Sequence, residues 1–191
     1  MDVIQMLKKD HKMVRQLFQD FEELSGQRGA QKKPALVEQI SQALTVHAQV
    51  EEELVYPAFQ EVRTLKDLLC EAKEEHLVAK QLLADLEQLQ PDNEQYDAKV
   101  KVLCEYVMHH VKEEEKEIFP QAQKKLSSKH LSTLGEEVQE RRSLLMGEGD
   151  EIDGTKDGDI EAAALKDERS ENENDMNAHK GKSERGRRQA A

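Results

Sequence analysis

Apolar residues recur at alternating intervals of three and four along most of the first 146 residues, which is the spacing of one face of a helix. This pattern predicts four long helices and a short fifth. The four long stripes are Ile4, Leu7, Val14, Phe18 and Phe21; Leu36, Ile40, Leu44 and Leu54; Leu65, Leu69, Ala72, Ala79, Leu83 and Leu86; and Val100, Leu103, Val107 and Ile118.

Local signals place the ends of these helices. The first is expected to stop near "SGQRG", and the second to start around Pro34, which suits a first helical turn. The third stops before "PDNE", and the fifth, "SKHLSTLGEEVQERRSLLM", begins with a serine cap signal. Long helices with short connections predict an all-α fold, an up-and-down antiparallel four-helix bundle with a short fifth helix.

Polar residues interrupt every long stripe at positions that should face the core. The first and third helices each carry one histidine there, and the second and fourth each carry a histidine with a glutamate four residues later. The six residues are His11, His47, Glu51, His76, His110 and Glu114. One buried histidine usually finds an ordinary hydrogen-bond partner, but six buried polar groups are costly unless they are paired or bound to metal. Two divalent cations in the centre would satisfy all six.

The spacing of these residues suits a shared metal site. Side chains four residues apart lie above one another on a helix, so His47 and Glu51 can contact one cation while the carboxylate reaches a second. His110 and Glu114 repeat the arrangement. The ferritin-like di-iron bundles use Glu-x-x-His, whereas this chain has His-x-x-x-Glu, so the order points away from them.

An internal repeat selects the same residues. The stretch "HAQVEEELVYP" (47–57) aligns with "HVKEEEKEIFP" (110–120), and "DHKMVRQLFQDFEEL" (10–24) aligns with "EHLVAKQLLADLEQL" (75–89). His47 therefore corresponds to His110, and His11 to His76. Two similar helical hairpins predict a pseudo-twofold pair of metal positions.

Residues next to the six are assigned lesser roles. His109 and Glu113 lie one position off the stripe, so a surface or supporting role is expected. Tyr56 could shield the site, but its phenol would have to deprotonate to bind metal. Pro57 and Pro120 each remove a helical hydrogen bond, which predicts that the helix ends or kinks there. The glutamates predicted to form a solvated face are Glu52, Glu53, Glu115 and Glu117.

Composition indicates where the folded domain ends and which classes of partner are excluded. Residues 1–146 form the predicted domain, whereas 147–191 have no aromatic side chain and predict a disordered charged tail. The net charge of -12 argues against a nucleic acid as main partner. With no long apolar run and no signal-peptide pattern at the start, a cytoplasmic protein is expected. Cys70 and Cys104 stand apart, which predicts reduced, buried thiols rather than a zinc site or a disulfide.

The order of the six residues resembles the hemerythrin-like family with the HHE cation-binding domain: His, then HxxxE, then His, then HxxxE. The resemblance covers about residues 2–126 and implies a four-helix bundle with a non-haem di-iron centre. It further implies that His11 and His47 bind one iron and His76 and His110 the other, with Glu51 and Glu114 bridging.

One position departs from the oxygen-carrying hemerythrins, whose third helix supplies two histidines four residues apart. Here the positions four residues either side of His76 are Ala72 and Lys80. The resemblance then implies one imidazole fewer at the second iron. An open coordination position favours a substrate or peroxide over reversible O2 carriage.

The main functional hypothesis is a di-iron protein that binds or reacts with a small ligand, O2, NO or peroxide, in a redox or stress role. The alternative is an iron or oxygen sensor without turnover, and a helical interaction protein without metal is a third reading. Mixed imidazole and carboxylate ligands also suit manganese and zinc, so the ligand types leave the metal open. No residue defines the reaction or indicates a protein partner.

Overall fold

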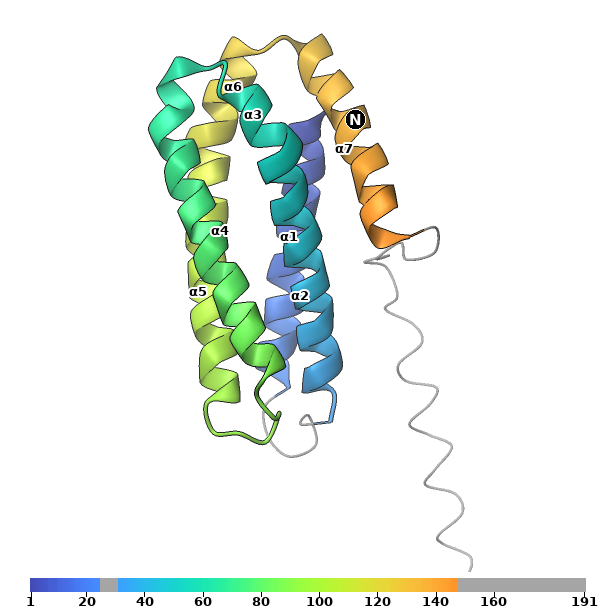
Figure 1. Cartoon of the computed structure of the whole chain (residues 1–191), viewed down its shortest axis with the longest axis vertical. Helices are drawn as coiled ribbons and strands as arrows, with labels where there is room; N and C mark the ends of the chain where they lie inside the picture. The colour runs from blue at the N-terminus through green and yellow to red at the C-terminus, as the bar shows by residue number, and fades with distance from the viewer. Residues whose placement is uncertain (25–30, 148–191) are drawn as a thin grey trace, which may run out of the picture. The chain divides into compact units, whose positions relative to one another are not determined.

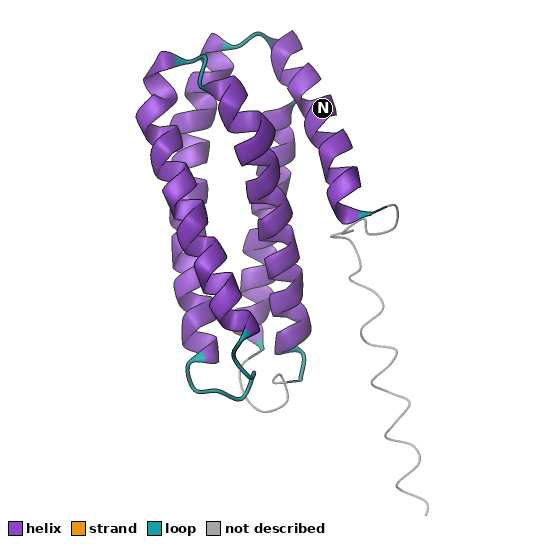
Figure 2. Ribbon diagram, in the orientation of Figure 1, coloured by secondary structure: helices purple, strands orange, loops and turns teal. Residues whose placement is uncertain are grey.

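The computed structural model describes residues 1–24 and 31–147, and within these ranges every regular element is a helix (Figures 1 and 2). The predicted disordered tail, beyond Gly147, and the whole of "SGQRG" lie outside the described residues. The elements are α1 (Val3–Glu23), α2 (Lys33–Val50), the π-helical turn η1 (Glu51–Val55), α3 (Tyr56–Phe59), the 3-10 turn η2 (Arg63–Leu65), α4 (Lys66–Glu87), α5 (Tyr96–Glu113), the π-helical turn η3 (Glu114–Ile118), α6 (Phe119–Lys125) and α7 (Ser128–Met146).

The predicted four-helix bundle with a fifth helix is confirmed. Helix α1 packs against α2, and α4 packs against α5, so the two halves of the sequence repeat form two hairpins (Figure 1). Helices α3 and α6 continue the directions of α2 and α5. Helix α7 lies outside the four, against α1 and α2. No helix in the described ranges is long and apolar enough to cross a membrane.

Side-chain caps fix where the first and last helices begin. The carboxylate of Asp2 accepts a hydrogen bond from the backbone N–H of Gln5 at 2.9 Å, and the hydroxyl of Ser127 accepts one from His130 at 3.1 Å. Pro34 stands in the first turn of α2, as predicted.

A close approach between backbones holds α7 on the bundle. A Cβ atom added at Gly135 would lie 2.6 Å from the backbone oxygen of Met1, so only glycine allows α7 to pack this tightly on the start of α1. A cluster of buried apolar residues lies here, between α7, the first turns of α1 and α4, and the segments around both π-helical turns.

The helices do not end at Pro57 or Pro120, contrary to one of the expected outcomes. A five-residue π-helical turn precedes each proline, and the chain then re-enters an α-helix. The backbone N–H of Tyr56 reaches back five residues to Glu51, and that of Phe119 does the same to Glu114. The wider turn accommodates the proline ring and begins in both cases at a predicted ligand.

Candidate metal centre

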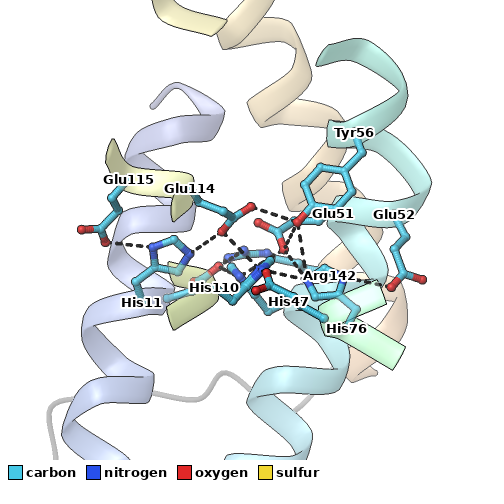
Figure 3. Close-up of polar contacts among 12 residues, drawn as sticks. His11, His47, Glu51, Glu52, Tyr56, His76, His110, Glu114, Glu115 and Arg142 are labelled. Carbon is cyan, nitrogen blue, oxygen red and sulfur yellow. Dashed lines mark hydrogen bonds and ion pairs between the residues drawn. The ribbon is translucent and has the colours of Figure 1, made fainter. Parts of the chain in front are cut away.

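All six predicted residues meet in the middle of the bundle (Figure 3). None of them is more than 6% exposed, and the two carboxylates are fully buried. Each long helical segment supplies its predicted share: His11 from α1, His47 and Glu51 from α2 and η1, His76 from α4, and His110 and Glu114 from α5 and η3.

The ligand-type atoms of these residues fall into two overlapping groups. His11, His47, Glu51 and Glu114 form one group, and Glu51, His76 and His110 form the other, with the candidate atoms of each group within 4.8 Å of one another. Glu51 joins both, because its Oε2 lies 3.2 Å from Nε2 of His47 and 3.3 Å from Nε2 of His76.

Glu114 occupies the corresponding position in the second hairpin. Its Oε2 lies 3.2 Å from Nε2 of His11 and 3.5 Å from Nε2 of His110. Each carboxylate therefore stands between one histidine of its own hairpin and one of the other. This is the pseudo-twofold arrangement that the sequence repeat predicts.

Each histidine turns Nε2 toward the centre and donates from Nδ1 to a carboxylate outside it. Such partners orient an imidazole and raise its basicity as a metal ligand. The four pairs, with their Nδ1 to oxygen distances, are His11 and Glu115 at 2.9 Å, His47 and Asp10 at 3.3 Å, His76 and Glu52 at 2.9 Å, and His110 and Glu75 at 2.8 Å.

These four acids were not predicted from the sequence as part of the site. Glu52 and Glu115 were assigned to a solvated face, and that assignment is wrong, because both bond a core histidine. The signal was present in the repeat: an acid directly precedes His11 and His76, and another directly follows Glu51 and Glu114.

For the remaining residues near the site and for the two cysteines, the predicted exposure is correct in some cases and wrong in others. His109 is 60% exposed, with Nδ1 3.8 Å from Glu113, in agreement with a surface role. Glu53 and Glu117 are exposed. Both cysteines are free thiols, but the expected burial is wrong, because Cys70 is exposed and Cys104 is only partly buried.

The aromatic residues after the two π-helical turns break the twofold symmetry. The hydroxyl of Tyr56 donates to Oε1 of Glu114 at 2.9 Å and lies 3.5 Å from Nε2 of His76, and its ring stacks on that imidazole. Phe119, at the equivalent position, stacks on His11 without a polar contact of that kind. Tyr56 is fully buried and so covers the site, as expected.

Lys80 is one of the two positions four residues from His76, the other being Ala72, and its side chain turns outward. Its ammonium lies 2.8 Å from both carboxylate oxygens of Glu52. Beside it, a cavity of about 30 Å³ opens onto all four core histidines and is lined mainly by apolar side chains such as Leu44, Ala79 and Val107.

Mutual interactions shift the pKa values within this group. Burial opposes a charge on His110, but the carboxylates of Glu114 and Glu75 raise its pKa to about 9. Burial and the nearby His110 lower the pKa of His76 to about 4. Burial and the Glu114 carboxylate raise the pKa of Glu51 to about 7. Burial alone would raise the pKa of Glu114, but His110 and His11 hold it far below its usual range. The centre therefore retains protons that a cation would displace.

Several buried nitrogen and oxygen atoms at the centre have no hydrogen-bond partner, and this favours metal cations there. Within the described part of the chain, five buried side-chain atoms lack a hydrogen-bond partner, and four of them face this centre: Nε2 of His11, Nε2 of His47, Oε1 of Glu51 and Oε2 of Glu114. Leaving each such atom unpaired costs about 1–3 kcal/mol. All four are of ligand type, so cations would satisfy them.

A helical bundle with histidines and bridging carboxylates in its core defines a class of metal-binding domain. The chain belongs to the family described as the hemerythrin HHE cation binding domain, which matches residues 2–122. The resemblance seen in the sequence is thereby confirmed.

Two known proteins are similar to this chain. The crystal structure of a hemerythrin HHE cation binding domain-containing protein from Mycobacterium kansasii superimposes with a TM-score of 0.65 at 22% identity, covering 76% of this chain and 87% of that one. A protein named DNA nickase from Nostoc sp. is 29% identical over 145 residues, which is 76% of this chain and 40% of the relative. The chain therefore spans less than half the length of that relative.

Proposed function

We propose that this protein binds two iron ions and binds or reacts with O2, NO or peroxide. The observation that carries the proposal is the set of four unpartnered buried ligand atoms at the meeting point of all four helices. His11 and His47 would hold one ion and His76 and His110 the other, with Glu51 and Glu114 between them. Imidazole and carboxylate together suit iron, and the carboxylates supply two negative charges.

The surrounding residues support this role by orienting the ligands and by excluding water. Each Nδ1 is held by a carboxylate, so each Nε2 is presented to the centre. Bound iron would supply a ferrous and ferric couple that exchanges electrons with a small oxidant. Neither Ala72 nor Lys80, the two positions four residues from His76, is a histidine, so the second iron would have one imidazole fewer than in the oxygen carriers.

The cavity beside the four core histidines favours a small ligand. A volume of about 30 Å³ holds one or two water-sized molecules, and its apolar walls admit a neutral diatomic molecule more readily than an ion. Tyr56 closes the opposite side and can donate a hydrogen bond toward the centre. These features support O2, NO or neutral peroxide as ligand and leave the choice among them to experiment.

The activity in the name of the Nostoc relative is not proposed for this chain. The net charge of -12 opposes binding to a phosphate backbone, and only 40% of that relative is matched. Incubation of the iron-loaded protein with supercoiled plasmid should leave the plasmid intact, and metal-dependent nicking would refute this expectation.

A sensor role without turnover is the second candidate, because α7 contacts the side chains that support the metal centre. Arg142 of α7 is bonded to Asp10, the partner of His47. Loss of metal could then loosen α7. Thermal melting with and without iron tests this candidate, and equal melting temperatures would exclude it.

Reaction of the ferrous protein tests the main proposal. Protein reconstituted with iron in the absence of O2 should change its visible spectrum when O2, NO or hydrogen peroxide is added, and the same ligands should leave metal-free protein unchanged. If iron binds but none of the three alters the spectrum, the proposed ligand class is wrong and the sensor role is favoured.

A further inference from the structure

Asp10 lies between a core histidine and the fifth helix. Its Oδ2 is 3.3 Å from Nδ1 of His47 and also accepts from Nη2 of Arg142, whose Nη1 donates to Oδ1 at 3.0 Å. Both partners are largely buried, with Arg142 15% and Asp10 14% exposed. The planar guanidinium thus makes a bidentate contact with both carboxylate oxygens, which fixes the carboxylate in one orientation.

Arg142 has no counterpart in the sequence repeat. In the repeat, Arg15 corresponds to Lys80. Each lies four residues after a core histidine, and they pair with Glu115 and Glu52 respectively. Arg142 instead comes from α7, which follows both hairpins and lies beyond the family match at residues 2–122. Among the described residues, no lysine or arginine pairs with Glu75, the counterpart of Asp10.

We infer that Arg142 is a positioning residue for the cation site: by holding Asp10, it fixes the imidazole of His47 as a ligand for one of the two ions. This inference rests on the proposed function, since it requires that His47 bind metal. It makes α7 part of the metal centre rather than an appendage to the bundle. It also makes the two metal positions unequal, because only one depends on α7.

The long contact between His47 and Asp10 explains why the arginine matters. The other three histidines have a carboxylate within 2.8–2.9 Å, whereas this pair is 3.3 Å apart. A hydrogen bond of this length is weak, so it cannot hold Asp10 by itself. Without Arg142, Asp10 would be a largely buried carboxylate without a cation, and it would turn toward water. His47 would then lose its oriented acceptor.

Cobalt(II) titration of the metal-free full chain, followed by calorimetry and visible absorption, tests the inference. Wild-type protein should bind two ions. Arg142→Met keeps an unbranched apolar side chain but removes the guanidinium. It should weaken one binding step by about 10–100-fold, the usual effect when a ligand loses its outer partner. The other step should change by less than about threefold. Arg142→Lys keeps the positive charge but cannot make the bidentate contact, and it should weaken the same binding step by a smaller factor.

Arg141 supplies a matched control. It pairs with Glu53 at 2.7 and 3.1 Å, and Glu53 is bonded to Gln49 rather than to a histidine. Arg141→Met should therefore leave both binding steps unchanged. In an Asp10→Asn background, Arg142→Met should cause little further weakening, because the arginine acts through that carboxylate.

Several results would overturn the inference. These are unchanged or tighter binding in Arg142→Met, equal weakening of both steps, the same loss in Arg141→Met, or full additivity with Asp10→Asn. If Arg142→Met loses helicity, the comparison of Arg142→Lys with wild type decides. Wild-type affinity for both ions in Arg142→Lys would then count against the inference. Wild-type protein that binds no cobalt would contradict the proposed function itself, and with it this inference.

Discussion

Replacing His110 by alanine should abolish one metal position, whereas replacing the adjacent His109 should not. The two residues form a matched pair, because they share a helix turn and a side-chain type but differ in direction. His110 is 6% exposed and points its Nε2 to within 3.1 Å of His76. His109 is 60% exposed and faces the surface.

The size of the effect follows from the number of ligands that remain. His76 and Glu51 would be left to the second ion, with Glu114 as the remaining carboxylate. Changes to outer partners of ligands typically cost 10–100-fold in affinity, so loss of an inner imidazole should cost at least about 100-fold. That corresponds to about 2.8 kcal/mol of binding free energy.

Elemental analysis and competitive titration with a chelator provide the assay. His109→Ala should retain two ions at wild-type affinity, and His110→Ala should retain one tightly bound ion. Far-UV circular dichroism of both metal-free variants separates loss of a ligand from loss of fold. Equal metal loss in the two variants would refute the orientation of α5 described above. Full metal content in a folded His110→Ala variant would refute its role as a ligand.

Three further predictions test the outer partners, the protons and the packing of the centre. Glu115→Gln should weaken metal binding by about tenfold, because a neutral amide accepts the bond from His11 less strongly, and Glu117→Gln at an exposed position is its control in the same titration. Metal affinity should rise with pH between about 6 and 9, by up to about tenfold per pH unit for each proton that the metal displaces. The reason is that the pKa of His110 is raised to about 9 and that of Glu51 to about 7. A metal affinity that does not change with pH would contradict this. Gly135→Ala should destabilise the fold by about 1–3 kcal/mol in urea unfolding, since its Cβ would meet the backbone of Met1, and an unchanged midpoint would contradict the packing of α7.

Residues that interrupt a regular pattern were the most predictable part of the molecule. The four helices follow from their apolar spacing, and His11, His47, His76 and His110 were found because they occupy core positions where an apolar side chain is expected. The internal repeat fixed the same register independently. All six predicted residues accordingly lie together in the folded chain.

The outer partners could not be predicted because nothing in local sequence separates them from ordinary surface charge. Glu52 and Glu115 stand in runs of glutamate, and only their direction in the fold makes them partners of histidines. Arg142 is more distant still, since its contact with Asp10 depends on how α7 packs on α1. Both are tertiary contacts and leave no periodic signal.

The two prolines show where a local rule gives way to a wider helical turn. Pro57 and Pro120 were expected to end or kink their helices, because proline lacks an N–H and its ring crowds the preceding turn. The π-helical turns at Glu51 and Glu114 relieve that crowding, and the helices continue beyond. Both turns begin at a candidate ligand, in agreement with the frequent occurrence of such turns at functional sites.

The most direct test of the account is the metal content of the full chain purified from iron-supplemented cells. About two irons per chain in the wild type, falling to about one in His110→Ala and unchanged in His109→Ala, is the predicted result. A folded, stable protein that contains no metal and takes up none on reconstitution would contradict the account, because the six buried polar residues would then have to be satisfied by protein groups alone.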